Sequence, residues 1–439
     1  MNIILLSGGS GKRLWPLSNE VRSKQFIKLF KRPDGEYESM VQRVFRQINE
    51  TIPDAKITIA TSKAQVSAIQ NQLGEKVSVS VEPSRRDTFP AIALAAAYLH
   101  DELGISENGS VVVCPVDPYV DNSYFESLGK LNMIVENGSS DLALMGIRPT
   151  YPSEKYGYII PEDDLDVSKV RAFKEKPDGK TAQQYIDQGA LWNGGVFAFK
   201  IRYLLEKVEE IVGYTNYGRL YSNYDSLPKI SFDYEVVEKE KSLQVFRFSG
   251  EWRDVGTWNT LTEVMDGPSL GETVIQEECE NVHVINELDV PVIAMGLHDV
   301  VISASPQGIL IADKTQSSYI KPLVDGIEQQ VMFAEKSWGS YRVLDAEDGS
   351  LTIKVTLKPG HSMNYHCHQH RDEVWVVIAG RGRIMLDGMR RTVHSGDIVS
   401  MKAGCYHTIL ALTELKIIEV QVGEEINTDD KMMHLKVEL

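Results

Sequence analysis

The sequence predicts an α/β domain followed by two β-rich parts. Up to residue 266, strand-like apolar runs alternate with segments of helical periodicity, which is typical of a parallel sheet with right-handed crossovers. Between 281 and 323, bursts of β-branched residues separated by Gly, Asn, Asp or Pro resemble the stacked strands of a small β-solenoid. From 332 to 422, many short strands with close turns favour a β-sandwich or small barrel. We therefore expect three parts, at 1–266, 267–328 and 329–439.

The first part shows this alternation in order. A strand at 3–6 opens the chain, and the strongest helix candidate, 91–103, is rich in Ala and Leu. Further helices are expected at 39–48, 66–73 and 203–212, and further strands at 56–60, 77–81 and 111–115. Ligands bind at the carboxyl ends of parallel strands. Gly8 and Asp117 each follow such an end, so we expect them to face the same crevice.

Length and composition describe a globular chain of about two or three domains. Its 439 residues carry a net charge of −16, which argues against a nucleic-acid partner because phosphate backbones bind a basic face. The four cysteines show no C-x-x-C spacing, so a reducing, cytoplasmic compartment is expected. No apolar run reaches about eighteen residues, so no membrane span is expected, and the first residues resemble a strand rather than a signal peptide.

The stretch at 7–18 has the features of a phosphate-binding loop. Its glycines let the backbone approach a ligand closely and let successive N–H groups converge on an anion, and a Lys-Arg pair adds two cations. Taken alone, such a pattern is more often a plain strand-to-loop turn with a solvated basic pair. The residues concerned are Gly8, Gly9, Gly11, Lys12 and Arg13.

Polar residues farther along the chain extend this pattern. Lys24 lies in a segment close enough to return over bound phosphates, and Arg86 directly precedes the strongest helix candidate. Asp117 and Asp254 are candidate ligands for Mg²⁺, which takes one or two carboxylates together with phosphate oxygens. Each of these residues alone is more often a solvated charge or a turn residue.

Nine motifs follow one another along the chain. They are LSGGSGKRLWPLS at 6–18, KQF at 24–26, EP at 82–83 with Arg86, PVD at 115–117, YGY at 156–158, FKEKP at 173–177, WNGGVF at 192–197, SFDY at 231–234 and WRDVG at 252–256. In these motifs and their order the chain resembles the sugar-nucleotide pyrophosphorylases over essentially its whole length. Within that family it is most similar to the long bacterial mannose-1-phosphate guanylyltransferases that carry a carboxyl-terminal cupin.

The resemblance implies a Rossmann-like nucleotidyltransferase (GT-A-like) domain that uses GTP and mannose 1-phosphate to form GDP-mannose and pyrophosphate. Such a reaction needs charge neutralisation and an in-line geometry. The resemblance implies nucleotide binding by Leu6, Gly8, Gly9, Gly11, Lys12, Glu82 and Arg86. It implies that Arg13 and Lys24 stabilise the triphosphate and the leaving pyrophosphate, and that Mg²⁺ is held by Asp117 and Asp254. Sugar-phosphate binding is implied for Gly157, Glu175, Lys176 and Asn193; the alternative for the Glu-Lys pair is an exposed charge pair beside a proline turn.

The third part resembles the cupins. The pattern G-x5-H-x-H-x4-E-x6-G runs from Gly360 to Gly380, and the segment 396–407 resembles the second cupin motif. Because alternate residues on a strand face the same side, the histidines can point together into a barrel. Three imidazoles and one carboxylate suit Zn, Fe, Mn or Ni, and the alternative is a set of surface or core histidines. The expected ligands are His366, His368, Glu373 and His407.

The cupin departs from its bifunctional relatives, in which this domain interconverts mannose 6-phosphate and fructose 6-phosphate. Where the signature of those relatives has a Gln, this chain has His366, and where it has a second His, this chain has Val374. Isomerase activity and a non-catalytic cupin are therefore both open.

The transferase part also departs from its family, because Lys12, Ser23 and Asp87 stand where Thr, Pro and Asn are common. A pyrophosphorylase for another sugar 1-phosphate or NTP is therefore one alternative. A binding protein that senses sugar nucleotides is the other, although the retained cations and aspartates speak against it. A homodimer is the default expectation for a soluble enzyme.

Overall fold

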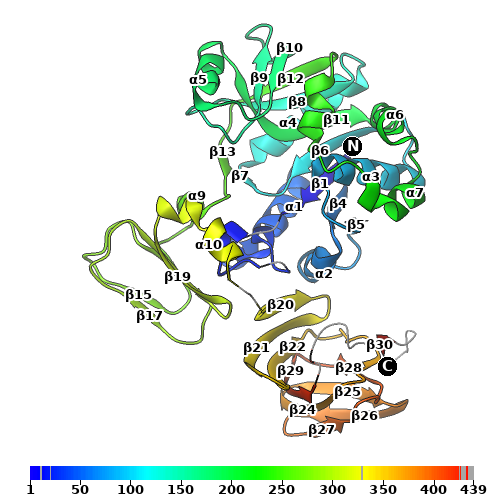
Figure 1. Ribbon diagram of the computed structural model, residues 1–439, viewed down its shortest axis with the longest axis vertical. Helices are drawn as coiled ribbons and strands as arrows, with labels where there is room; N and C mark the ends of the chain where they lie inside the picture. The colour runs from blue at the N-terminus through cyan, green and yellow to red at the C-terminus, as the bar shows by residue number, and fades with distance from the viewer. Residues whose placement is uncertain (10–11, 20, 328–329, 425, 427–431, 434–439) are drawn as a thin grey trace. The chain divides into compact units, whose positions relative to one another are not determined.

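The structure is a computed structural model that describes residues 1–9, 12–19, 21–327, 330–424, 426 and 432–433. Its contacts divide the chain into two compact units (Figure 1). The first unit contains Met1–Gly9, Gln25–Val66 and Lys76–Asp266, and the second contains Ser10–Lys24, Ser67–Glu75 and Gly267–Leu439. Among the described residues, no helix is long and apolar enough to cross a membrane.

A mixed sheet forms the centre of the first unit. Its strands are β1 (Asn2–Ser7), β4 (Lys56–Ser62), β5 (Ser78–Glu82), β6 (Ser110–Pro115), β8 (Leu142–Ile147), β9 (Tyr158–Pro161), β10 (Val167–Lys174), β11 (Leu191–Lys200) and β12 (Leu243–Phe248). They lie in the order β5-β4-β1-β6-β11-β8-β12-β10-β9. The first four are parallel, as predicted, whereas β11 runs antiparallel between β6 and β8. The sheet is therefore mixed and not purely parallel, because β10 and β11 both run antiparallel to their neighbours.

Helices cover both faces of this sheet (Figure 1). The helices of this unit are α1 (Met40–Thr51), α3 (Thr88–Asp101), α4 (Asn122–Glu136), α5 (Gly179–Asp187), α6 (Ile201–Val212), α7 (Tyr217–Ser222), α8 (Phe232–Glu235) and α9 (Trp258–Thr262), of which α3, α4, α5 and α6 contact strands of the sheet. The core around α3 contains Val113 and Phe197, whereas Tyr124 of α4 lies against Cys114, the next residue of β6 (Oη to Sγ 3.8 Å). Alternate residues of β6 therefore enter two cores, which is why this strand is apolar throughout.

The expected helices at 39–48, 66–73, 91–103 and 203–212 are confirmed as α1, α2 (Val66–Leu73), α3 and α6. Local signals explain their starts. Ser39 and Gln42 form a capping box at α1, and the Asp87 carboxylate accepts the N–H of Thr88 at the start of α3.

The two residues expected to face one crevice, Gly8 and Asp117, follow the ends of two neighbouring strands. Leu6 of β1 pairs with Pro115 of β6, and the N–H of Val116 donates to the Leu6 carbonyl (3.2 Å). Gly8 and Asp117 therefore follow adjacent strand ends, which confirms that they lie at the same edge of the sheet.

The second unit contains a stack of short strands that confirms the predicted β-solenoid. The strands are β14 (Ser269–Leu270), β15 (Thr273–Ile275), β16 (His283–Asn286), β17 (Val292–Ala294), β18 (Val300–Ser305) and β19 (Gly308–Asp313), and α10 (Lys321–Asp325) follows them. Parallel pairing of β14 with β16, β16 with β18 and β15 with β17 stacks consecutive coils around a small apolar core.

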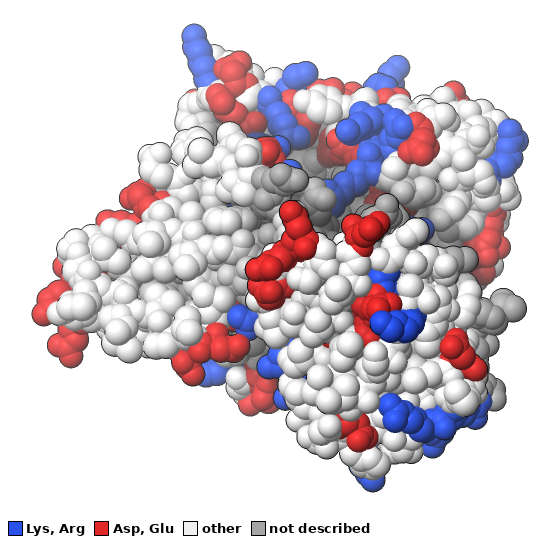
Figure 2. Space-filling model, turned by 60° about the horizontal axis from the view of Figure 1, so that its bottom comes forward, with Lys and Arg blue, Asp and Glu red and all other residues white. Residues whose placement is uncertain are grey.

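The outside of the β-solenoid carries exposed apolar side chains. Val274 of β15 pairs with Ile293 of β17, and both are exposed, as are Ile309 and Ile311 of β19. Figure 2 shows a broad, mostly uncharged surface on the left, the side on which Figure 1 places these three strands. In β19, partly buried and exposed residues alternate because only one face of the strand has a core beneath it.

The cupin consists of two facing sheets. The first contains β20 (Phe333–Lys336), β21 (Gly339–Glu347), β22 (Ser350–Leu357), β24 (Arg371–Ala379), β27 (Ile398–Met401) and β29 (Leu415–Gly423). The second contains β23 (His366–Cys367), β25 (Arg381–Leu386), β26 (Met389–His394), β28 (His407–Ala411) and β30 (Met432–Met433). One apolar core takes Trp375 and Ile417 from the first sheet and Ile384 and Ile409 from the second, as expected for a small β-barrel.

Candidate active site and metal centre

The glycine loop begins directly at the end of β1. Gly8 and Gly9 are exposed, and Gly9 has φ of 124°, a backbone conformation that side chains rarely adopt. Gln65 donates to the Gly9 carbonyl (3.4 Å), which fixes the backbone there. The predicted ligand Leu6 is a partly buried residue of β1, and Gly11 lies outside the described residues.

The basic residues that follow the loop belong to the second unit. Lys12 and Arg13 form a single 3-10 turn, in which Arg13 is exposed, and Lys24 begins another turn at Lys24–Phe26. The Lys12 ammonium lies 2.7 Å from the carboxylate of Asp325 at the end of α10. Its hydrogen bond lowers the pKa of Asp325. Sequence reasoning did not anticipate this acidic partner of Lys12.

Glu82 and Arg86 approach the segment between α7 and α8. Glu82, the buried last residue of β5, accepts a hydrogen bond from the Tyr224 hydroxyl (2.7 Å), and burial raises the pKa of its carboxyl. Arg86 donates to the Leu227 carbonyl (3.3 Å) and lies 3.9 Å from Asp225. These hydrogen bonds join the end of β5, the edge strand of the sheet, to residues about 140 positions later in the chain.

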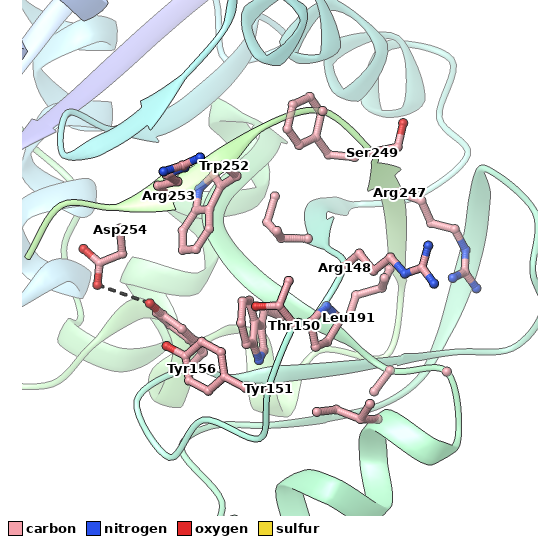
Figure 3. A pocket seen from close by; sticks show the side chains of 18 of the residues that line it. Arg148, Thr150, Tyr151, Tyr156, Leu191, Arg247, Ser249, Trp252, Arg253 and Asp254 are labelled. Carbon is pink, nitrogen blue, oxygen red and sulfur yellow. Dashed lines mark hydrogen bonds between the residues drawn. The ribbon is translucent and has the colours of Figure 1, made fainter. Parts of the chain in front are cut away.

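The two aspartates predicted to bind Mg²⁺ occupy neighbouring backbone positions. The short strands β7 (Pro118–Val120) and β13 (Trp252–Asp254) pair antiparallel, with Asp254 opposite Pro118, the residue after Asp117. The Tyr156 hydroxyl donates to Asp254 Oδ2 (3.2 Å), as drawn in Figure 3. Oxygen ligands of this kind suit Mg²⁺, so the residues present fit the predicted metal.

Tyr156 belongs to an aromatic cluster that lines a pocket of about 1020 Å³ (Figure 3). Its ring centroid lies 4.8 Å from that of Trp192 and 5.7 Å from that of Trp252. Burial, with the nearby Asp254 charge as a second cause, raises the pKa of Tyr156 far above its ordinary value, so the hydroxyl stays a donor. Among the described residues predicted for the site, Asp254 is the one that lines this pocket.

The predicted sugar-phosphate residues come together across β9, β10 and β11. Gly157 precedes β9, Glu175 follows β10, and the N–H of Asn193 in β11 donates to the Gly157 carbonyl (2.8 Å). A Cβ on Gly157 would overlap Glu175 Oε2, so a larger residue here would displace the Glu175 carboxylate. The structure therefore places Gly157, Glu175 and Asn193 in one group, as their assignment to a common ligand requires.

Glu175 has one carboxylate oxygen that can accept a hydrogen bond from a ligand. It is 6% exposed, and its Oε1 lies 2.7 Å from the Lys176 ammonium. Within the described part of the chain its Oε2 is buried without a hydrogen-bond partner, which is costly unless a ligand completes the site. Lys176 has φ of 45°, an unusual conformation for a residue with a side chain and one that occurs at functional sites.

Asp233 is the member of this group that sequence reasoning missed. Its carboxylate accepts a hydrogen bond from the Asn193 side-chain amide (Oδ1 to Nδ2, 2.6 Å). Burial, and next the negative charge of Glu175, raise the pKa of Asp233 to about 6. The only available signal was its position inside the motif at 231–234, to which the resemblance attached no role.

The histidines predicted for the cupin metal are brought together. His366 of β23 is paired with His407 of β28, and the candidate ligand nitrogens of His366, His368 and His407 all lie within 4.8 Å of one another. The three residues are buried. Nδ1 of His366 lies 2.7 Å from the Asn364 carbonyl and Nδ1 of His407 lies 3.0 Å from the Cys405 carbonyl, which leaves their Nε2 atoms directed elsewhere.

Glu373 joins the histidines from the facing sheet. Its carboxylate oxygens lie 3.1 Å from His368 Nε2 and 3.2 Å from His407 Nε2. The His407 nitrogen is nevertheless buried without a hydrogen bond of acceptable geometry among the described residues, which is the arrangement expected of a ligand atom. The donor set of three imidazoles and one carboxylate therefore fits a divalent transition metal.

Arg371 is a second residue that sequence reasoning missed. It is 9% exposed and donates to Glu373 Oε1 (Nε to Oε1, 3.2 Å), and its Nη2 lies 3.1 Å from His368 Nε2. Burial raises the pKa of Glu373, but His407, His368 and Arg371 outweigh it and lower the pKa to about 2. The carboxylate is therefore kept ionised at this centre.

A glycine loop and Asp117 follow adjacent strand ends of an α/β sheet, and Asp254 lies on a strand paired beside Asp117, an arrangement that suits an enzyme that transfers a nucleotidyl group. The chain belongs to the nucleotidyl transferase family, whose model matches residues 2–267. Residues 326–435 match the family described as mannose-6-phosphate isomerase C-terminal.

Individual relatives cover nearly the whole chain. The mannose-1-phosphate guanylyltransferase of Escherichia coli K12 is 29% identical, with 97% of this chain and 96% of that protein covered. The xanthan biosynthesis protein XanB of Xanthomonas campestris pv. campestris B100 is 30% identical, again over 97% of this chain and 96% of that protein. The crystal structure of mannose-1-phosphate geranyltransferase from Thermus thermophilus has a TM-score of 0.61 at 29% identity and covers 74% of this chain and 98% of that chain. These comparisons confirm the predicted family and class of enzyme.

Proposed function

We propose that the chain transfers a guanylyl group from GTP to mannose 1-phosphate, forming GDP-mannose and pyrophosphate. The observation that carries the proposal is the group of Gly157, Glu175 and Asn193, which offers a buried carboxylate oxygen to a ligand hydroxyl. The names of full-length relatives support the same substrates. We further propose that 1–266 is the transferase domain, 267–328 a connecting β-solenoid and 329–439 the cupin.

The proposed reaction joins a phosphate oxygen of the sugar phosphate to the α-phosphorus of GTP. The bond between the α- and β-phosphates breaks, and its electrons leave with pyrophosphate. Arg13 and Lys24 would neutralise the triphosphate and the leaving group, and Lys176 would bind the sugar phosphate. Mg²⁺, held by Asp117 and Asp254, would supply screening of the repulsion between the two anions.

Nucleotide binding would use the glycine loop and the residues beside it. Exposed backbone at Gly8 and Gly9 can approach a phosphate because neither residue has a side chain. The other residues proposed to bind the nucleotide are Leu6, Gly11, Lys12, Glu82 and Arg86.

We propose that the cupin holds one divalent transition metal through His366, His368, Glu373 and His407. An isomerase that acts on mannose 6-phosphate or fructose 6-phosphate is the second candidate function, favoured by the family match of residues 326–435. A coupled isomerase assay on the metal-loaded protein tests it. The absence of turnover would leave a metal-binding, non-catalytic cupin.

The transferase proposal is tested by a grid of nucleoside triphosphates against sugar 1-phosphates in the presence of Mg²⁺, read out as pyrophosphate release. GTP with mannose 1-phosphate should give the highest kcat/KM. Turnover with another pair would reassign the substrates. No turnover with any triphosphate would refute the transferase and favour a binding protein that senses sugar nucleotides.

The metal assignment is tested by Asp254→Asn and Asp117→Asn. Each should lower kcat by about a thousandfold or more, because the carboxylate charge that holds the cation is lost. Glu251→Gln, three residues before Asp254 and paired with Arg253 at the surface, is the matched control and should keep wild-type activity. Wild-type kcat in either aspartate variant would show that the metal ligands are elsewhere.

A further inference from the structure

Asp233 contacts Asn193, one of the residues proposed to bind the sugar phosphate, but it was not itself predicted to bind that ligand. It is the second residue of α8, whose start is capped by the Ser231 hydroxyl (Oγ to the N–H of Tyr234, 3.3 Å). The preceding residue, Phe232, is fully buried in the core, and its N–H donates to Thr88 Oγ1 (2.8 Å). The backbone that carries Asp233 is therefore held firmly against β11 and α3.

The Asn193 amide is held at both ends. Its Nδ2 donates to Asp233 Oδ1 (2.6 Å), and its Oδ1 accepts the N–H of Gly195 (3.1 Å). An ionised carboxylate can only accept, and a backbone N–H can only donate, so the two contacts select one of the two amide orientations. The short distance is that of a charge-assisted hydrogen bond. One N–H of Asn193 remains for a ligand.

Gly195 makes this arrangement possible. It has φ of 68° and lies in the irregularity that interrupts the pairing of β11 with β8 between Asn193 and Phe197. The backbone bends there so that the N–H of Gly195 turns back to the side chain of Asn193.

We propose that Asp233 is a positioning residue of the sugar-phosphate site, whose carboxylate fixes the orientation of the Asn193 amide. This inference rests on the proposed function of the site. Asp233 acts through Asn193, and no contact of its own with the sugar phosphate is required.

Among the described residues, the charged groups that act directly on Asp233 are Glu175 and Lys176. Burial lowers the pKa of Lys176, but the hydrogen bond and charge of Glu175, with a smaller contribution from Asp233, outweigh it. The elements packed against α8 are α3, capped by Asp87, and the 3-10 turn Val237–Lys239. The two charged residues of that turn are engaged elsewhere, Glu238 with Lys174 and Lys239 with Glu235.

The carboxylate at this position opposes folding, which argues for a role in function. An Asn at position 233 could pair with Asn193 in either amide orientation, and it would place no second negative charge beside Glu175. Because burial and Glu175 raise the pKa of Asp233 to about 6, its ionisation at neutral pH lowers the stability of the folded state. Charges that lower stability in this way are typical of functional sites.

The proposal predicts a specific pH dependence. Below about pH 6, a protonated Asp233 is a weaker acceptor for Asn193, and Lys176 loses one of its negative neighbours. The kcat/KM for mannose 1-phosphate should therefore fall on the acid side with an apparent pKa near 6, while the KM for GTP stays unchanged.

The test compares Asp233→Asn with the wild type. At pH 8 the variant should lose about 10- to 100-fold in kcat/KM for mannose 1-phosphate, with the KM for GTP unchanged, and its acid limb near pH 6 should be absent. Glu235→Gln, in the same helix, is the matched control and should retain both the rate and the limb. An unchanged rate or an unchanged limb in Asp233→Asn would overturn the proposal.

A stability measurement separates positioning from a merely structural role. The raised pKa means that Asp233 favours folding fully below its unfolded pKa of about 3.8, and that this contribution is lost as the pH rises through about 6. Relative to the wild type, Asp233→Asn should therefore have a higher Tm at pH 8 than at pH 4.5. A purely structural Asp233 would give a variant that is less stable at pH 8, and that outcome would overturn the proposal.

Binding of mannose 1-phosphate, measured by calorimetry, keeps the two proposals distinguishable. If the wild type binds the sugar phosphate but turns over no triphosphate, the proposed function fails. Weaker binding by Asp233→Asn, by about 10-fold or more, would still support the positioning role. Equal binding by both proteins would refute it.

Discussion

Two buried carboxylates, one in each unit of the molecule, have pKa values that are shifted in opposite directions. Asp233 of the first unit faces the carboxylate of Glu175 and a neutral amide, and its pKa is raised to about 6. Glu373 of the cupin faces two imidazoles and the Arg371 guanidinium, and its pKa is lowered to about 2. Burial alone favours the neutral acid in both places. The charge of the partners therefore decides which carboxylate costs stability and which contributes it.

The largest effect is expected in the cupin, where the charged partners of Glu373 are predicted to make its carboxylate stabilising. Glu373→Gln removes the negative charge that contacts both the buried Arg371 guanidinium (3.2 Å) and His368 (3.1 Å), which should destabilise the cupin by about 3–5 kcal/mol. Calorimetry of chelator-treated protein measures it as a lowered unfolding transition. The variant should also bind less metal than the wild type, as determined by elemental analysis.

The neighbouring Asp372 provides the control for this change. It is exposed and pairs with Lys402, so Asp372→Asn should leave the transition of the cupin unchanged. A Glu373→Gln protein as stable as the wild type would contradict the view that Arg371 depends on this carboxylate.

A second variant, Glu175→Gln, tests in the first unit whether the negative charge of Glu175 raises the pKa of Asp233. It replaces the unpartnered acceptor oxygen with a donor or a neutral acceptor, and kcat/KM for mannose 1-phosphate should fall about 100-fold. It also removes the negative charge beside Asp233, so the acid limb should move below pH 6. Glu162→Gln, an exposed change in the same unit, should alter neither quantity. An acid limb that does not move would show that Glu175 has no influence on Asp233.

A histidine beside a buried lysine in the β-solenoid tests whether the charge of a partner also decides the pKa shift of a basic group. His283 Nδ1 lies 2.8 Å from the buried Lys314 ammonium, and burial followed by this charge lowers the pKa of His283 to about 4. A folded state that prefers the neutral imidazole keeps its full stability above about pH 6.5 and loses it as the pH falls toward 4. Thermal unfolding of His283→Gln should therefore depend less on pH in this window than that of the wild type. His298→Gln, an exposed histidine of the same segment, should behave as the wild type.

The smallest effect is expected at Asp254, whose partner Tyr156 is a neutral hydroxyl and not a charged group. Tyr156→Phe removes the hydrogen bond to Asp254, and the Mg²⁺ concentration for half-maximal rate should rise about 2- to 10-fold, with kcat at saturating Mg²⁺ nearly unchanged. Tyr119→Phe, on the strand paired with β13, is the control. Equal Mg²⁺ dependence in all three proteins would mean that the hydroxyl does not orient Asp254.

Sequence reasoning predicted the parts of the site that depend on local signals. The glycine loop after β1, Asp117 after β6 and the His-x-His pair of the cupin each follow from a short pattern next to a strand end. The helices α1, α2, α3 and α6 also follow from periodicity and caps. Arg371 was missed because nothing in its local sequence separates a buried arginine from a solvated one.

The family and the fold types could be predicted from the sequence, as could the candidates for the site, because these depend on residue type and on spacing within one segment. Only the tertiary structure decided that β11 runs antiparallel beside β6, that Asp233 accepts from Asn193, and that Lys12 pairs with Asp325. Each of these contacts joins residues at least 40 positions apart. Their formation depends on how whole elements pack, and this in turn determines whether a buried charge meets a partner of the opposite or of the same sign.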